Sequence, residues 1–392
     1  MNSEERTIVL ISTSHGMMHA YLVLLPAMIP ILGGELGDIA TVGMLASLVS
    51  LFYGWLSLPV GFMADRFSRK TLVAASMFLC GGASVIIGLS PNIPVAALGL
   101  VLLGAGASLY HPAGYAHMSA VSDENRGRYM GIQGLGGDMG MAVSYLTSSV
   151  LGSAFGWRAT FLIWGVVGLA MGALDMMAAQ DIQDNTHNTQ HPGPVETFKR
   201  MFGVSERRTL LLTLGLVVLS GMLWTGVASF IMVFIEEVKN TSFLIAGGLS
   251  TLKYTVGAFA QILGGEMSDR FGRRRLLLLG YLGFAIFLVA FVLAPGNLAV
   301  LTLLVVALGF TFFITQSPMN ALLGDVSRKD TVGVTYGVNF TLKYGVGFFT
   351  PAIAGYLALN HGLPSVFYFF AALSLLATVI TLAIRERPRP AS

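Results

Sequence analysis

Charged residues are scarce in this chain of 392 residues, because Asp, Glu, Lys and Arg together make up only 11%. Soluble domains carry about a quarter of their residues as charges, so a hydrated globular surface is excluded. Cysteine is nearly absent, and the single Cys80 excludes an intrachain disulfide or a thiolate metal cluster. Hydrophobic residues reach 54%, and the mean hydropathy is +0.73. The composition predicts a protein surrounded by membrane lipid. The sequence has no soluble segment rich in basic and aromatic residues, so nucleic acid is not expected as a partner.

Apolar runs long enough to cross about 30 Å of hydrocarbon recur along the whole chain. They predict twelve membrane-spanning helices, at roughly 8–32, 41–63, 71–89, 95–118, 129–152, 159–179, 209–235, 243–266, 276–293, 298–321, 332–357 and 366–384. One longer polar stretch separates the sixth run from the seventh. We therefore expect an all-α membrane protein with an N-terminal six-helix bundle (1–179), a cytoplasmic linker (180–208) and a C-terminal six-helix bundle (209–392).

Basic residues are distributed unevenly between the two ends of these spans. All Lys and Arg residues except Arg158, Lys239, Lys253 and Lys343 fall in segments that share one side of the membrane. The positive-inside rule then predicts that both termini are cytoplasmic in a multi-pass protein of a bacterial cytoplasmic (inner) membrane. The first apolar run is a full span, so no cleaved signal peptide is expected.

Two loops of nearly the same sequence follow the second and the eighth predicted spans. Each combines a glycine, which permits close helix approach, with an aspartate and several arginines at matched spacing. The aspartate can accept hydrogen bonds from a helix N-terminus and pair with arginine, so the loops predict a conformational latch on the cytoplasmic side. The predicted latch residues are Gly61, Asp65, Arg66 and Arg69 in the first loop, and Gly265, Asp269, Arg270 and Arg273 in the second.

In these loops the chain resembles the major facilitator superfamily, whose hallmark is a repeated G-x-x-x-D-R-x-G-R-[RK] motif. Gly156-Trp157-Arg158 before the sixth span is also similar to that superfamily, while Ser68 replaces a glycine of the first motif. The resemblance implies twelve helices in two halves, each an inverted three-helix repeat, and secondary transport by alternating access. It implies no enzyme activity and no cofactor, and we expect a monomer.

A finer resemblance concerns the fosmidomycin-resistance-type efflux carriers, which export a phosphonate antibiotic. It rests on Ser14-His15, on residues 106–112 (Gly-Ala-Ser-Leu-Tyr-His-Pro), and on Gly127 with Gly136-Gly137. This resemblance favours efflux over uptake.

Lysine occurs twice within apolar spans, in two segments that repeat nearly the same sequence. Residues 251–257 read Thr-Leu-Lys-Tyr-Thr-Val-Gly, and residues 341–347 read Thr-Leu-Lys-Tyr-Gly-Val-Gly. Both Lys253 and Lys343 lie about 15 Å deep at a rise of about 1.5 Å per residue, too deep to reach the interface. An intramembrane charge indicates a functional site, so we expect the lysines to bind an organic anion such as a carboxylate or phosphonate, with hydroxyl groups from Tyr254 and Tyr344.

Asp138 is the one acidic residue predicted at a similar depth. A single carboxylate cannot neutralise two ammonium groups, so it is expected to be a resting counter-ion and a proton carrier. Three alternatives stay open. The lysines form a purely structural ion pair with Asp138, or a neutral lysine carries the proton. In the third, the protein is a proton-driven multidrug or cation exporter that uses Asp138.

Histidines form the second ionisable set in the predicted spans. His15 and His19 are four residues apart and share a helix face, while His111 precedes a proline in the fourth span. Imidazole titrates near neutral pH, so all three are expected to take part in proton coupling, and His19 also in substrate binding. No metal site is expected, because neither flank supplies the Glu of an H-E-x-x-H motif. An intramembrane enzyme using the histidines and Asp138 is a remote alternative, and Asp175 is expected to be a solvated boundary residue.

Overall fold

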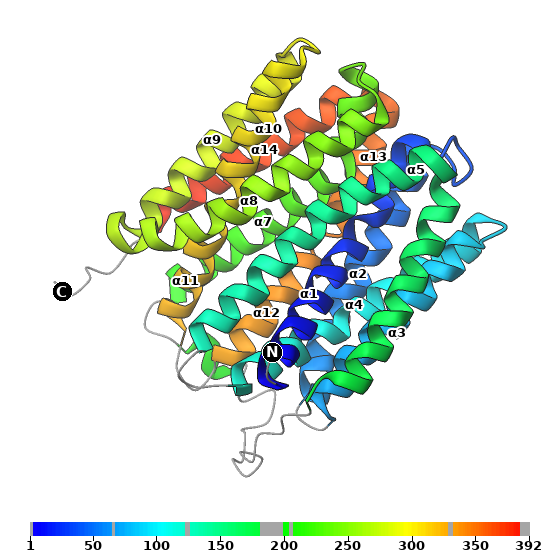
Figure 1. The fold of residues 1–392 in the computed structure, drawn as a ribbon. Coiled ribbons are helices and arrows are strands. Elements are labelled where there is room, and N and C mark those ends of the chain that lie inside the picture. The colour runs from blue at the N-terminus through cyan, green and yellow to red at the C-terminus, as the bar shows by residue number, and fades with distance from the viewer. Residues whose placement is uncertain are drawn as a thin grey trace.

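The computed structural model describes residues 3–64, 67–121, 126–180, 199–203, 207–327 and 332–384, which are helical apart from short connections (Figure 1). The first half contains α1 (Ser3–Met28), the short 3-10 turn η1 (Ile29–Ile31), α2 (Ile39–Ala64), α3 (Arg69–Gly88), α4 (Ile93–Val121) and α5 (Arg126–Ala178). The second half contains α7 (Arg207–Val233), the π-helical turn η2 (Phe234–Val238), α8 (Phe243–Phe271), α9 (Arg273–Leu293), α10 (Leu298–Phe313), α11 (Gln316–Val326), α12 (Val332–Gly345), α13 (Phe349–His361) and α14 (Leu363–Ala383).

These helices make the twelve membrane crossings that the sequence predicts. Ten of the described helical segments are individually long and apolar enough to span a bilayer. The longest, α5, turns back at Gly156, whose φ of 80° and ψ of 170° interrupt the helix, so α5 supplies two crossings. α12 and α13, each too short alone, together supply one more. The all-α fold is confirmed, and α1 begins at the end of the bundle where α14 ends, as an even number of crossings requires (Figure 1).

The tenth and eleventh crossings are broken helices, whereas the sequence predicts each as one continuous span. Pro351 cannot donate a backbone hydrogen bond to the carbonyl of Gly347, which instead accepts from Thr350 N at 3.0 Å and from Thr225 Oγ1 at 2.8 Å. Pro318 leaves the carbonyl of Ile314 without its helical donor in the same way, where α10 gives way to α11. Both breaks place irregular backbone inside the protein, where other side chains can satisfy it.

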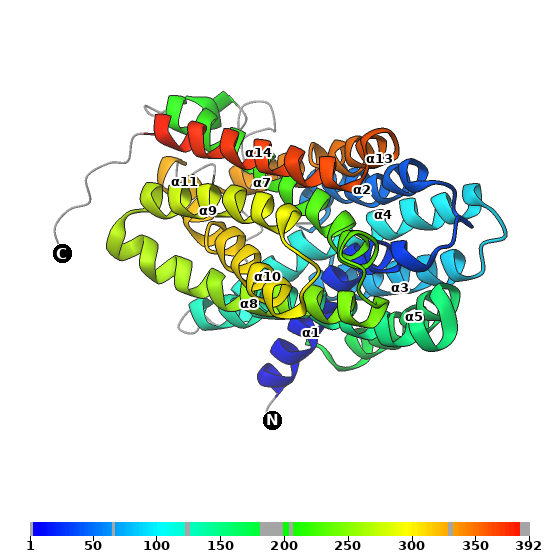
Figure 2. The ribbon, with the colours of Figure 1, turned by 90° about the horizontal axis from the view of Figure 1, so that it is seen from above.

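The two halves of the chain lie on opposite sides of the bundle (Figure 2). Among the described residues they meet most extensively where α5 packs along α8 and where α2 packs along α12 and α13, with a smaller contact between α1 and α7. Thr251 Oγ1 donates to a backbone carbonyl of α5 at 3.1 Å in the first, and the Trp55 indole donates to Gly345 O at 3.0 Å in the second. Lys253 and Lys343 lie two residues from these bonds, so each lysine stands beside an interface between the halves.

The predicted division into bundles at 1–179 and 209–392 stays a prediction. Most of its linker, residues 180–208, lies outside the described residues.

Glycines hold α1 directly against α5. A Cβ at Gly140 would collide with the backbone of Gly16, and a Cβ at Gly137 would stand 2.8 Å from His15 Cε1 and 3.1 Å from His19 Cδ2. Small residues that allow such close approach are typical of helix contacts in membranes. The histidine face of α1 is therefore pressed against the part of α5 that carries Asp138.

Candidate functional site

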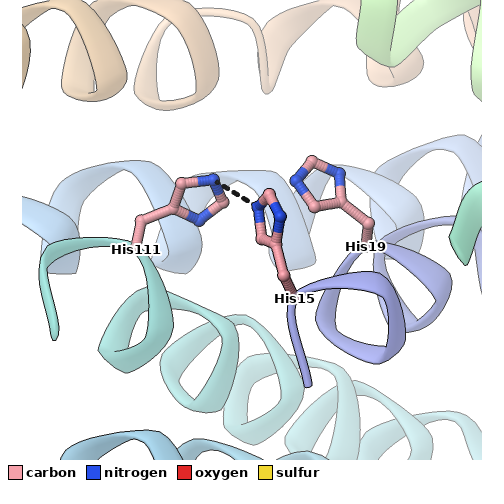
Figure 3. Close-up of side chains that lie close together, drawn as sticks. All are labelled: His15, His19 and His111. Carbon is pink, nitrogen blue, oxygen red and sulfur yellow. Dashed lines mark hydrogen bonds between the residues drawn. The ribbon is translucent and has the colours of Figure 1, made fainter. Parts of the chain in front are cut away.

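Three histidine rings from two helices meet in the interior of the first half (Figure 3). His15 and His19 project from successive turns of α1, and His111 projects from α4. The Nε2 atoms of His15 and His111 are 3.5 Å apart, and one ring nitrogen from each of the three residues lies within 4.8 Å of the other two. Each residue is at least 92% buried. The helical spacing predicted the first pair, but only the fold brings in the third ring.

Hydrogen bonds to other helices orient two of these rings. His15 Nδ1 lies 2.6 Å from the backbone carbonyl oxygen of Gln133 on α5, and His111 Nδ1 lies 2.9 Å from the hydroxyl of Tyr53 on α2. A carbonyl oxygen can only accept, so His15 Nδ1 carries a proton and Nε2 of the neutral ring presents a lone pair towards His111. His19 Nδ1 is buried and has no hydrogen-bond partner among the described residues.

Lys343 has a neutral hydrogen-bond partner among the described residues. Its Nζ donates to Gln316 Oε1 at 2.9 Å, across the gap between α12 and the first residue of α11. The ammonium also lies 5.7 Å from the centroid of the Tyr344 ring. An ammonium group has three N–H donors, so within the described part of the chain two of them remain free for another acceptor.

Lys253 is more completely enclosed and has less polar support. The residue is only 3% exposed, and its Nζ lies 4.0 Å from the centroid of the Tyr254 ring and 5.6 Å from that of Phe313. Within the described part of the chain it makes no hydrogen bond and no ion pair. Aromatic faces stabilise a cation but accept no ordinary hydrogen bond, so all three donors of Lys253 remain available.

Asp138 on α5 lies near enough to interact electrostatically with both lysines. It is 9% exposed, and among the described residues it forms no ion pair within 4.0 Å. The structural ion pair considered from the sequence is therefore not formed in this structure. The site combines two cations and one anion that stay apart.

The two tyrosines beside the lysines are packed among other rings. Tyr254 stacks on Tyr145 with ring centroids 5.3 Å apart, and its buried hydroxyl has no partner among the described residues. Tyr344 lies 4.5 Å from the Tyr53 ring and 5.4 Å from Trp224. Tyr53 also bonds His111, so it connects the histidines to the lysine region, and Lys343 interacts electrostatically with His19 and His111. The predicted substrate and proton residues form one neighbourhood.

Asp175 corrects one interpretation made from the sequence. It was expected to be solvated, but it is fully buried near the end of α5 and accepts a 2.6 Å hydrogen bond from Ser14 Oγ. The sequence position near a membrane boundary is misleading because α1 covers this part of α5. Gln316, Gln133 and Tyr53 were missed, although a glutamine inside an apolar run, as at Gln316, is a signal that could have been used.

The second of the two predicted latch loops can be followed in the structure. Arg273 Nε lies 3.0 Å from Asp325 Oδ2, and Arg273 Nη2 lies 3.9 Å from Asp269 Oδ1, so one arginine joins α8, α9 and α11. In the first loop Asp65 and Arg66 lie outside the described residues. The described residues place no atom within 4 Å of a Cβ built on Gly61, so the close approach predicted there is not seen. The latch role itself stays a prediction.

Replacing Asp269 with Asn should slow transport while changing the substrate dissociation constant by less than about twofold, because this exposed carboxylate supports a helix-end contact away from the lysines. Initial rates in proteoliposomes and equilibrium binding in detergent measure the two quantities. Asp38→Asn is the control, since the exposed Asp38 accepts hydrogen bonds from Thr41 in its own short connection. A large loss of affinity in the Asp269 variant would contradict the latch role.

Comparison with known proteins places this architecture in a family. Residues 9–351 match the model of the Major Facilitator Superfamily, and the chain belongs to that superfamily. A probable sulfoacetate transporter of Cupriavidus necator is 23% identical over 364 residues, covering 85% of this chain and 82% of that protein. The proline/betaine transporter of Escherichia coli is 25% identical over 383 residues, covering 87% and 75%.

The fold comparison agrees. The crystal structure of a bacterial homologue of the human lysosomal transporter Spinster, inward-facing and occupied, superposes with a TM-score of 0.82 at 16% identity, covering 97% of this chain and 98% of that one. The protein is thus a multi-pass membrane transporter and not an enzyme, which sets the enzyme alternative aside. The resemblance to fosmidomycin-resistance-type carriers stays a prediction.

Proposed function

We propose that this protein is a secondary active transporter of a small organic anion, coupled to protons through Asp138. The observation that carries the proposal is the unbalanced charge of its interior. Lys253 is a buried cation and Lys343 a partly buried one, and the nearby carboxylate of Asp138 forms an ion pair with neither of them among the described residues. Buried charges without partners are costly, so a ligand that supplies negative charge would stabilise this arrangement.

The free donors of the two lysines indicate the chemistry of the ligand. Lys253 presents three N–H groups and Lys343 two, a set that suits a compact group with several acceptor oxygens, such as a carboxylate, sulfonate or phosphonate. The aromatic rings around both ammonium groups would contact the apolar part of the same molecule. A relative named for sulfoacetate supports this class, whereas a relative named for proline and betaine makes zwitterions the necessary comparison.

Alternating access would follow from where the lysines stand. Each lies beside an interface between the halves, so an anion that contacts both would favour one relative arrangement of α5–α8 and α2–α12 over another. Asp138 would couple protonation to anion binding, because its ionised carboxylate repels the anion and its protonation removes that repulsion. Both the substrate and the proton thereby act on one group of charges.

The membrane location, topology and oligomeric state of the protein are part of the same proposal. The distribution of Lys and Arg supports cytoplasmic termini in a bacterial inner membrane, and we keep the predicted monomer. Export rests on the fosmidomycin-resistance-type resemblance alone. The roles predicted for His15, His19 and His111 in proton coupling stay predictions.

A proton-driven cation exporter is the second candidate, because Asp138 is a buried carboxylate that forms no ion pair with any residue the structure describes. A cation could bind it directly and displace a proton. Against this reading, the cation would approach two ammonium groups that outnumber the carboxylate. The two candidates therefore differ in the sign of the substrate's charge.

Transport assays in proteoliposomes separate these candidates. We expect radiolabelled sulfoacetate or a related organic anion to accumulate when a pH gradient is imposed, and the accumulation to collapse with a protonophore. Proline and a lipophilic cation are the matched zwitterionic and cationic substrates, and reversing the gradient reveals the direction of coupling. Accumulation of the cation without the anions would overturn the proposal in favour of the exporter.

A further inference from the structure

We propose that His15, His19 and His111 form a binding site for a divalent transition metal ion of the Zn²⁺ type. This inference goes beyond the proposed anion transport and does not depend on it. Three imidazoles are typical ligands of such ions, and a three-histidine site leaves a coordination position open for water or another ligand.

The distances in the histidine cluster are close to those that a metal requires. Ligands at about 2.0–2.1 Å in a tetrahedral site are separated from one another by about 3.4 Å. The Nε2 atoms of His15 and His111 already stand 3.5 Å apart. The set as a whole lies within 4.8 Å, so a bound ion would draw the third nitrogen closer to the other two. The site is thus nearly preformed.

Groups behind the rings orient them as in known metal sites. A metal-bound histidine commonly donates its other ring N–H to a carbonyl or another acceptor, which fixes the tautomer. Gln133 O plays this part for His15, and the Tyr53 hydroxyl oxygen can accept from His111 Nδ1. Both Nε2 atoms then present lone pairs towards each other, an arrangement that a cation between them would stabilise.

The third ring supplies an independent indication. His19 is 92% buried, yet its Nδ1 has no hydrogen-bond partner among the described residues, and the ring lies beside the other two (Figure 3). A hydrogen bond between His15 and His111 would satisfy that pair and leave His19 unexplained. A bound ion engages all three rings. The sequence predicted no metal site because neither flank of His15 and His19 supplies the Glu of an H-E-x-x-H motif, and the approach of His111 from α4 is visible only in the fold.

Lys343 gives the proposal a directional consequence. Its ammonium interacts electrostatically with His19 and His111, so it would repel a divalent cation held by them. Lys343→Met should therefore tighten metal binding. The same variant should weaken anion binding, so the two proposals predict opposite effects and can fail separately.

The test uses the purified full-length protein, stripped of metal by a chelator and titrated with Zn²⁺ by calorimetry and with Co²⁺ by visible absorption. We expect one equivalent to bind, with the ligand-field bands of tetrahedral Co²⁺. His19→Gln and His111→Gln should each weaken binding by about 100-fold or more, and Tyr53→Phe by about 10-fold. His117→Gln, a buried histidine on α4 that is not part of the cluster, is the matched control and should retain full affinity.

Size-exclusion chromatography and thermal unfolding show that each variant is folded before titration. Failure of the folded wild-type protein to bind a stoichiometric ion would overturn the proposal. Equal affinity in the wild type and the His19 and His111 variants would also overturn it, because the metal would then be bound elsewhere on the surface.

Discussion

Replacing either Lys253 or Lys343 with Met should weaken anion binding by about 10-fold to 150-fold, because each change removes a charge-assisted interaction of roughly 1.5–3 kcal/mol. Equilibrium binding of the anion identified by transport, measured in detergent, gives the dissociation constants. The two losses should not add in the double variant, since both ammonium groups would contact one ligand. Lysine to arginine should be tolerated only in part, because the planar guanidinium does not replace a compact ammonium.

Lys239→Met is the matched control for removing a buried lysine. Lys239 is 5% exposed, and its Nζ donates to the backbone carbonyls of Val292 and Ala294 at 2.8 and 2.7 Å, at the end of α9. Its loss should lower stability and leave anion affinity unchanged. A similar loss of affinity in all three variants would show that removal of any buried lysine disturbs the fold, and would contradict the anion site.

The ion-pair alternative makes a different prediction for a second double variant. If Lys343 served only to neutralise Asp138, then Lys343→Met with Asp138→Asn should restore both stability and transport. The structure argues against this, because Lys343 bonds Gln316 and not Asp138. We expect the double variant to fold normally and to remain unable to bind the anion.

The sequence was sufficient for the fold because membrane spans have a strong and local signal. A run of about 20 apolar residues identifies a crossing wherever it occurs, and the duplicated loops at Asp65 and Asp269 indicated the family that the comparisons confirm. The breaks between α10 and α11 and between α12 and α13 were not predicted. Proline is tolerated in many membrane helices, as at Pro59 in α2, so whether it ends a helix depends on neighbouring groups that can satisfy the backbone.

Residues of the candidate site were predicted only where the signal lies within a single helix. His15 and His19 share a face by helical spacing, and the lysines were found from their repeated segments. That His111 approaches them from α4, and that Gln316 reaches Lys343 from α11, are properties of packing between helices far apart in sequence. Asp175 shows the converse, because its burial under α1 reverses an interpretation drawn from position alone.

Asp138→Asn should abolish accumulation of the anion driven by a pH gradient, while exchange of labelled for unlabelled anion continues. Asparagine has nearly the shape of the carboxylate but cannot take up a proton, so it mimics the protonated state permanently. In the wild type, anion affinity should rise as the pH falls, because protonation removes a negative charge beside the two lysines. In the variant, affinity should be independent of pH and up to about tenfold higher than in the wild type at high pH.

Asp175→Asn is the matched control, since Asp175 is a buried carboxylate in the second crossing of α5 that is bonded to Ser14 and is not part of the lysine site. It should alter stability and leave the pH dependence of anion binding intact. Accumulation measured in proteoliposomes, together with binding measured across the pH range, distinguishes coupling from affinity. If Asp138→Asn still concentrates the anion with the pH dependence of the wild type, the proton is carried by another group, and the histidines become the next residues to test. Zn²⁺ and protons compete for the same ring nitrogens of His15, His19 and His111. If the cluster binds Zn²⁺ tightly at neutral pH, the histidines therefore could not carry the coupled proton. The two experiments together would then assign the role of proton carrier to a lysine.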